Sequence, residues 1–191
     1  MSRTVEVDPV RLDRWIEGFA ARHDGATRAD VPGSFVLTGG DGSTATGEPF
    51  DHPRIGLVLV RRGGHAVGRD EGGDLVAHTC GTAYVQGKTK KGGWSQQRYA
   101  RRRGNQADGV IGKVSELALR HLAPGSVDAL VLGGDRRMAE QVLDDDRLGH
   151  LRDLPRRTLW DLPDPRFAVL QEAARRARAV RITLEDASDR R

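Results

Sequence analysis

Three β-rich segments separated by glycine pairs constrain the fold of this chain more than any other feature. They cover residues 54–62, 63–70 and 73–85, and the pairs Gly63-Gly64 and Gly72-Gly73 stand where they meet. Short runs of hydrophobic and β-branched residues are typical of strands, and glycines between two such runs favour tight turns. The three segments are therefore predicted to form a meander of antiparallel strands.

The chain after the meander alternates helices with strands. Apolar residues recur at helical spacing over 95–122, which predicts a long helix, and its interior Gly104 weakens it by about 1 kcal/mol relative to alanine and is where it would break. The apolar run 127–132 predicts a strand buried on both faces. The elements expected after it are a helix at 136–146, a strand at 157–160, a helix at 165–178 and a strand at 180–184. This order predicts an α+β (mixed α/β) fold, a mixed sheet with helices packed on it.

Residues 1–50 are predicted to form an amino-terminal subdomain. Asp8-Pro9 is a helix start signal, and the apolar residues after it recur at helical spacing. Short strands are expected at 35–37 and within 38–49. The chain is thus divided into a subdomain at 1–50, a domain at 51–185 with a basic loop at 86–94 and a long helix at 95–122, and a tail at 186–191.

Composition excludes several classes of protein. No apolar run approaches the ~20 residues that cross a bilayer, and the first twenty residues carry acids where a signal peptide would be apolar, so a soluble cytoplasmic protein is expected. The single cysteine, Cys80, cannot form an internal disulfide and is interpreted as a buried thiol. Six dispersed histidines show no ligand spacing. We expect neither a metal nor an organic cofactor.

The distribution of charge indicates a polyanionic partner. The formal net charge of the chain is only +4, but residues 86–106 contain seven Lys and Arg and no Asp or Glu, which leaves the rest at −3. A concentrated basic segment on an acidic body is typical of a contact with nucleic-acid phosphates. The basic side chains of the segment are Lys88, Lys90, Lys91, Arg98, Arg101, Arg102 and Arg103.

The residues between these charges form the strongest constellation in the sequence. Gly92 and Gly93 allow backbone conformations and close approaches that other residues do not. Trp94 and Tyr99 offer planar groups for stacking, while Arg98, Arg101 and Arg102 share a helix face that can grip phosphates. Gln96 and Gln97 do not titrate near neutral pH, but an amide can hold a water and, with backbone N–H groups, stabilise an oxyanion.

This segment resembles the loop and helix of the middle domain of eukaryotic and archaeal class-I peptide release factors. In that family a Gly-Gly-Gln tip precedes a Ser-x-x-Arg-Phe-x-Arg helix, and Ser95, Arg98, Tyr99 and Arg101 match the helix. Trp94 stands where the glutamine of that tip would be. The tip Gly93-Trp94-Ser95-Gln96 is instead similar to the Gly-x-Ser-Gln tip of the Vms-like branch. The resemblance covers about residues 54–184.

The resemblance implies a bacterial Vms-like release factor that hydrolyses the ester of peptidyl-tRNA on stalled ribosomes or large subunits. It makes Gln96 the catalytic candidate, with Gln97 as a rival, and gives Gly92, Gly93 and Ser95 a role in the tip. The implied partners are the ribosome, at the peptidyl transferase centre of the large subunit, and peptidyl-tRNA. Two alternatives stay open: an endonuclease that cuts tRNA near its 3′ end, as some relatives are described, and a non-catalytic module that docks on RNA or the ribosome.

Overall fold

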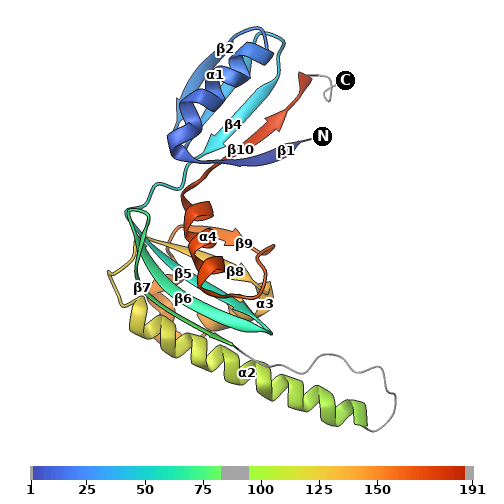
Figure 1. Cartoon of the computed structure of the whole chain (residues 1–191), viewed down its shortest axis with the longest axis vertical. Helices are drawn as coiled ribbons and strands as arrows, with labels where there is room; N and C mark the ends of the chain where they lie inside the picture. The colour runs from blue at the N-terminus through green and yellow to red at the C-terminus, as the bar shows by residue number, and fades with distance from the viewer. Residues whose placement is uncertain (1, 83–94, 188–191) are drawn as a thin grey trace. The chain divides into compact units, whose positions relative to one another are not determined.

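The computed structural model describes residues 2–82 and 95–187, and for 95–106 it describes the backbone alone. Two compact units divide the chain, one made of Met1–Asp51 with Arg176–Arg191 and the other of His52–Arg175. Each unit contains a five-stranded sheet (Figure 1). This architecture confirms the predicted α+β fold class. None of the helices in the described residues has the length and hydropathy of a membrane span.

The first unit is an antiparallel sheet with a helix on one face. Its strands lie in the order β1 (Arg3–Val7), β10 (Val180–Glu185), β4 (Thr44–Glu48), β3 (Ser34–Gly39) and β2 (Ala26–Val31). The helix α1 (Leu12–Arg22) follows a short 3-10 turn, η1 (Pro9–Arg11). Phe19 of α1 is fully buried and belongs to one apolar core with Phe35 and Ile182 of the sheet. Burial of this one face holds the unit together.

Local signals fix both ends of the α1 region. The carboxylate of Asp8 accepts a hydrogen bond of 3.0 Å from the Val10 N–H, and Pro9 occupies the first position of the turn. The chain after α1 reverses through Asp24 and Gly25, whose φ angles are 55° and 88°. Both lie in the left-handed region, which ends a helix. The predicted start signal is confirmed, and the helix ends close to the predicted Gly25.

The position of β10 differs from the predicted domain boundary. The sequence pattern predicts 180–184 within the domain at 51–185, whereas β10 lies between β1 and β4 in the first sheet, with Ile182 opposite Val5 and Gly47. Alternation along a strand shows that one face is buried but not which sheet the strand joins. The expectation followed the tendency of consecutive elements to be neighbours, and β10 is an exception to it.

The edge strands β1 and β2 were not predicted. Every residue of β2 is exposed, and only Val7 of β1 is buried. Because an edge strand without a buried face carries no alternation of apolar and polar residues, hydrophobic patterning cannot detect it.

The second unit is built on a mixed sheet. Its strands lie in the order β7 (Asp74–Thr82), β6 (Gly64–Glu71), β5 (Arg54–Arg61), β8 (Ala129–Gly134) and β9 (Arg156–Leu159). The pairs β5·β6 and β6·β7 are antiparallel, which confirms the predicted meander. β5, β8 and β9 run parallel to one another. All six residues of β8 are buried, as predicted for a central strand covered on both faces.

Helices cover both faces of this mixed sheet. They are α2 (Ser95–His121), α3 (Arg136–Leu143), the 3-10 segment η2 (Asp146–Leu151) and α4 (Phe167–Arg178). A Cβ built on Gly56 would lie 3.1 Å from Leu122, just beyond α2, and one built on Gly68 would lie 3.1 Å from Leu170 of α4. Gly68 pairs with Leu57, the neighbour of Gly56, so the two glycines face opposite sides. α2 and α4 therefore pack on opposite faces.

Candidate functional site

The predicted site residues divide between α2 and a segment outside the described residues. The amino-terminal turns of α2 contain Ser95, Gln96, Gln97, Arg98, Tyr99, Arg101, Arg102 and Arg103, for which the backbone is described. Six predicted residues lie outside the described residues: Lys88, Lys90, Lys91, Gly92, Gly93 and Trp94. The backbone places the two candidate glutamines next to each other in the first turn of a 27-residue helix.

The first turn of α2 has the electrostatic character that suits an anionic partner. The first N–H groups of a helix have no acceptor within the helix, and the helix dipole puts partial positive charge there. The first turn of α2 contains no acidic residue that would neutralise this field. Ser95, Gln96 and Gln97 thus stand where N–H groups without an acceptor inside the helix can bind an oxyanion or a phosphate.

The carboxyl-terminal half of α2 anchors the helix to the sheet. Val114 and Ala118 are fully buried, and Leu117 is 8% exposed, in the core that also contains β5 and β8. Just beyond the helix, the imidazole Nε2 of His150 lies 2.7 Å from the carbonyl oxygen of Leu122, to which it can donate a hydrogen bond. The predicted buried face is confirmed along this half. The helix also passes through Gly104 without a break, so the weak helix propensity of this one glycine does not end it.

An ion-pair network attaches η2 to the outer side of α2. Arg147 Nη1 lies 2.8 Å from Glu116 Oε1 of α2, and Arg147 Nη2 lies 2.8 Å from Asp145 Oδ2. The hydrogen bond from Arg147 lowers the pKa of Asp145 below its ordinary value. The contacts of Arg147 thus tie the anchored half of α2 to the rest of the unit.

The amino-terminal turns of α2 point toward the carboxyl ends of the parallel strands. Leu122 packs beside Gly56 at the start of β5, and Lys113, earlier in the helix, acts electrostatically on His65 at the start of β6. His65 pairs with Val60 near the end of β5. α2 and β5 therefore run in opposite directions, so the amino-terminal end of α2 lies toward the carboxyl end of β5. Figure 1 shows the first turns of α2 running beyond the sheet. A rigid helix presents the candidate site away from its anchoring core.

His65 is a buried ionisable group that the sequence analysis did not single out. Its side chain is 1% exposed, and neither ring nitrogen has a hydrogen-bond partner among the described residues. A Cβ built on Gly81 would lie 2.6 Å from the ring, so only glycine leaves room for it. Burial, and next the charge of Lys113, lower the pKa of His65 below its ordinary value. In the sequence it was one of six dispersed histidines, with no signal of its burial.

This buried histidine predicts a pH-dependent stability of the second unit. Because the folded state lowers the pKa of His65, the unfolded chain binds more protons below about pH 6.5, and the free energy of unfolding falls as the pH falls through that value. We expect urea unfolding of the second unit between pH 7.5 and 5 to show a smaller loss of stability in His65→Leu than in the wild type. Identical losses in the two proteins would rule out His65 as the group responsible.

The described residues offer no cluster typical of a metal site. No group of three or more His, Cys, Asp or Glu side chains gathers at ligand distance within them. His78 instead packs its ring on Phe167, with 4.8 Å between the ring centres. Cys80, two residues on, is partly buried, and burial raises the pKa of its thiol. Packing thus explains the positions of both His78 and Cys80 without a metal ligand role.

These features define an α+β domain in which a sheet covered on both faces anchors a long helix that begins with Ser95 and Gln96. Residues 53–183 match the family model acVLRF1, described as the Actinobacteria/chloroflexi VLRF1 release factor. The match covers well over half of the chain, so the chain belongs to this release-factor family. It confirms the predicted Vms-like resemblance and its extent. No curated protein matches the chain.

Proposed function

We propose that this protein hydrolyses the ester that joins a nascent peptide to tRNA, on stalled ribosomes or separated large subunits. The observation that carries the proposal is the release-factor family match across 53–183, which includes the motif around Gln96. The partners are the large ribosomal subunit and its peptidyl-tRNA, so the reaction takes place in the cytoplasm.

In the proposed reaction Gln96 positions the attacking water. Its side-chain amide accepts a hydrogen bond from the water and holds the oxygen against the ester carbonyl carbon. As that carbon–oxygen bond forms, negative charge develops on the carbonyl oxygen, where free N–H groups of a helix start can stabilise it. The bond to the tRNA 3′ oxygen then breaks. The water supplies hydroxide to the peptide, which leaves as a carboxylic acid, and a proton to the tRNA, which regains its 3′ hydroxyl.

The neighbouring residues have supporting roles in this proposal. Gly92 and Gly93 let the backbone approach the ester closely, and Ser95 completes the tip. Gln97 is the rival for the water-positioning role, because it is the same residue type one position away. The aromatic groups of Trp94 and Tyr99 stack on bases or ribose.

The basic side chains supply most of the binding free energy. Lys88, Lys90 and Lys91 precede the tip, and arginines follow it at 98 and 101–103. Phosphate contacts by such residues are independent of sequence and weaken as salt rises. They would bring the tip to any large subunit that carries a peptidyl-tRNA, without reading a codon.

The loop lysines provide the test of this binding step. In Lys88→Gln, Lys90→Gln, Lys91→Gln we expect the affinity for large subunits carrying peptidyl-tRNA to fall roughly tenfold or more at low salt, and the slope of log affinity against log salt to decrease by about 2. Both are measured by filter binding or light scattering over a salt series. The rate of peptide release at saturating protein should change much less than the affinity for large subunits. Unchanged affinity and slope would show that this segment is not the contact.

A further inference from the structure

Three exposed arginines lie at the edge of the second sheet where its parallel strands end. Arg62 directly follows β5, Arg137 lies in the first turn of α3, which follows β8, and Arg166 directly precedes α4. All three side chains are exposed. Because β5, β8 and β9 are parallel, their carboxyl ends meet at the same edge. We refer to Arg62, Arg137 and Arg166 as the arginine edge.

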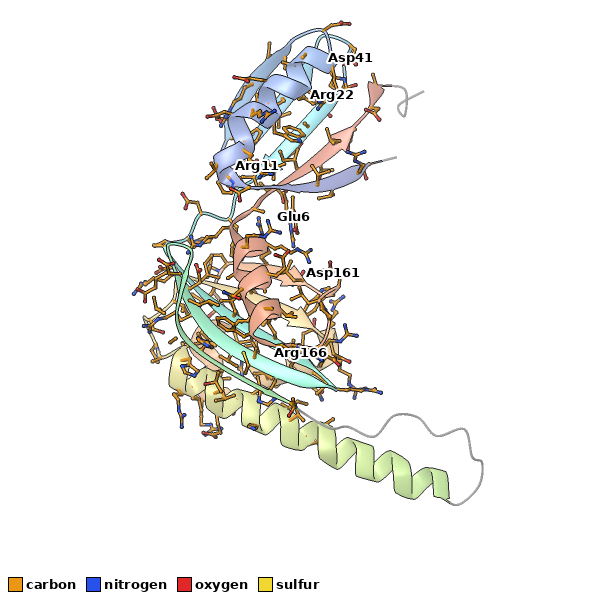
Figure 2. All side chains as sticks on the ribbon, viewed as in Figure 1. Glu6, Arg11, Arg22, Asp41, Asp161 and Arg166 are labelled. Carbon is orange, nitrogen blue, oxygen red and sulfur yellow. The ribbon has the colours of Figure 1, made fainter. Side chains whose placement is uncertain are left out.

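Contacts between the three segments bring the arginine edge together. A Cβ built on Gly64, the first residue of β6, would lie 2.9 Å from the carbonyl oxygen of Pro165. One built on Gly134, at the end of β8, would lie 2.7 Å from the side chain of Arg61. Figure 2 labels Arg166 near the hairpin at which β5 ends and β6 begins, in agreement with the contact between Gly64 and Pro165. Arginines far apart in the sequence thus share one surface.

The guanidinium groups of the arginine edge are not held in ion pairs within the part of the chain that the structure describes. The opposite end of the strands differs, since Arg54 Nη2 lies 2.6 Å from Asp128 Oδ1 and its Nε donates to Asp128 Oδ2 over 3.0 Å. An unpaired guanidinium keeps its charge and its donors available for a phosphate.

The carboxylates near the arginine edge are already engaged within the protein. Asp135 accepts a hydrogen bond of 3.1 Å from the Met138 N–H and so caps α3. Asp164 lies 3.7 Å from the Nε of Arg61, and Asp161 has its own contact within the chain. None of these carboxylates forms an ion pair with Arg62, Arg137 or Arg166.

The edge is also the end of the sheet toward which α2 carries the candidate tip. Among the side chains of α2 that the structure describes, Ala107 is the first that packs on the core, and it lies 11 residues after Gln96. At 1.5 Å per residue the packed part of α2 begins about 16 Å behind Gln96 along the helix. If the tip enters the large subunit as proposed, the edge follows it on the same side of the unit and can meet phosphates of the ribosomal RNA around the entry.

We propose that the arginine edge binds phosphates of large-subunit ribosomal RNA. This inference rests on the proposed function for the identity of the RNA, but it assigns a second contact, separate from the segment at 86–106. The exposed side chains of Arg62, Arg137 and Arg166 bind the RNA backbone and hold the body of the second unit against the subunit. Such contacts set position and affinity, not chemistry.

The test compares two variants with the same change in charge. Arg62→Gln, Arg137→Gln, Arg166→Gln removes the edge, and Arg11→Gln, Arg14→Gln, Arg22→Gln removes three exposed arginines of the first unit that make no ion pair with a described residue. Affinity for purified large subunits is measured over a salt series. We expect the edge variant to lose roughly tenfold to hundredfold in affinity at low salt and about 2 to 3 units of salt slope, with little change in the control.

The same measurement separates the alternatives. Equal losses in both variants, or no loss of slope in the edge variant, would overturn the proposal. So would a loss seen only when peptidyl-tRNA is bound, which would make tRNA the partner, or a loss that disappears on deproteinised ribosomal RNA, which would make it a ribosomal protein. Binding is measured independently of peptide release. A wild type that binds but releases no peptide would therefore refute the proposed function, while the salt dependence of binding would still decide whether the arginine edge contacts RNA. Equal thermal midpoints confirm that all proteins are folded.

Discussion

Replacing Gln96 with alanine is expected to lower the rate of peptide release roughly 100- to 1000-fold, the effect of removing one preorganised group that acts on the transition state. The affinity for large subunits should stay within about twofold, because the neutral amide makes no phosphate contact that depends on charge. Single-turnover release from large subunits carrying a labelled peptidyl-tRNA, at saturating protein, measures the chemical step apart from binding.

Gln97→Ala is the matched control for that result, since it makes the same change one position along the same helical turn. We expect release by Gln97→Ala within a few-fold of the wild type. A large loss in Gln97→Ala alone would transfer the water-positioning role to Gln97. Normal release by the double variant would contradict glutamine chemistry and favour a docking role for the segment.

The second large effect is expected at β10. Ile182 is fully buried in the core of the first unit, so Ile182→Ala should lower the free energy of unfolding of that unit by roughly 2–5 kcal/mol. Hydrogen exchange resolved by residue measures it. Protection should fall in β3 and β4 and stay unchanged in β5 and β8, because these two pairs of strands belong to different sheets.

Thr183→Ala provides the control for the β10 prediction. Thr183 is the next residue and faces the other side of the sheet, where it is partly exposed, so its loss should change protection little. If Ile182→Ala reduced protection in β5 and β8 instead, β10 would belong to the second unit, as the sequence pattern alone suggested. That result would contradict the division into two units.

The elements that the sequence predicted well are those with one-sided burial along a continuous stretch. The spacing of Val114, Leu117 and Ala118 marks the buried face of α2, and the buried run of β8 marks a central strand. The glycine pairs between β5, β6 and β7 mark turns that join consecutive antiparallel strands. In each of these cases the information lies in residues close together in the chain.

The features that the sequence did not predict depend on which distant segments meet. β10 closes a sheet begun almost 180 residues earlier, opposite β1, and its own pattern does not name that partner. The candidate tip was recognised because its motif is contiguous, and the roles of its residues stay predictions. The burial of His65 and the arginine edge arise from segments brought together only by folding. No local sequence pattern indicates whether an arginine will form an ion pair with a carboxylate in the folded protein.

The central claim is that this protein cleaves the peptide–tRNA ester, and the most direct test is to size both products of the reaction. Purified large subunits carrying a peptidyl-tRNA labelled on the peptide and on the tRNA are incubated with the wild-type protein, and the products are separated on denaturing gels. Our account predicts a free peptide with a terminal carboxylate together with a full-length tRNA bearing an intact 3′ end. A tRNA shortened at that end, with nucleotides left on the peptide, would contradict it and show a nuclease.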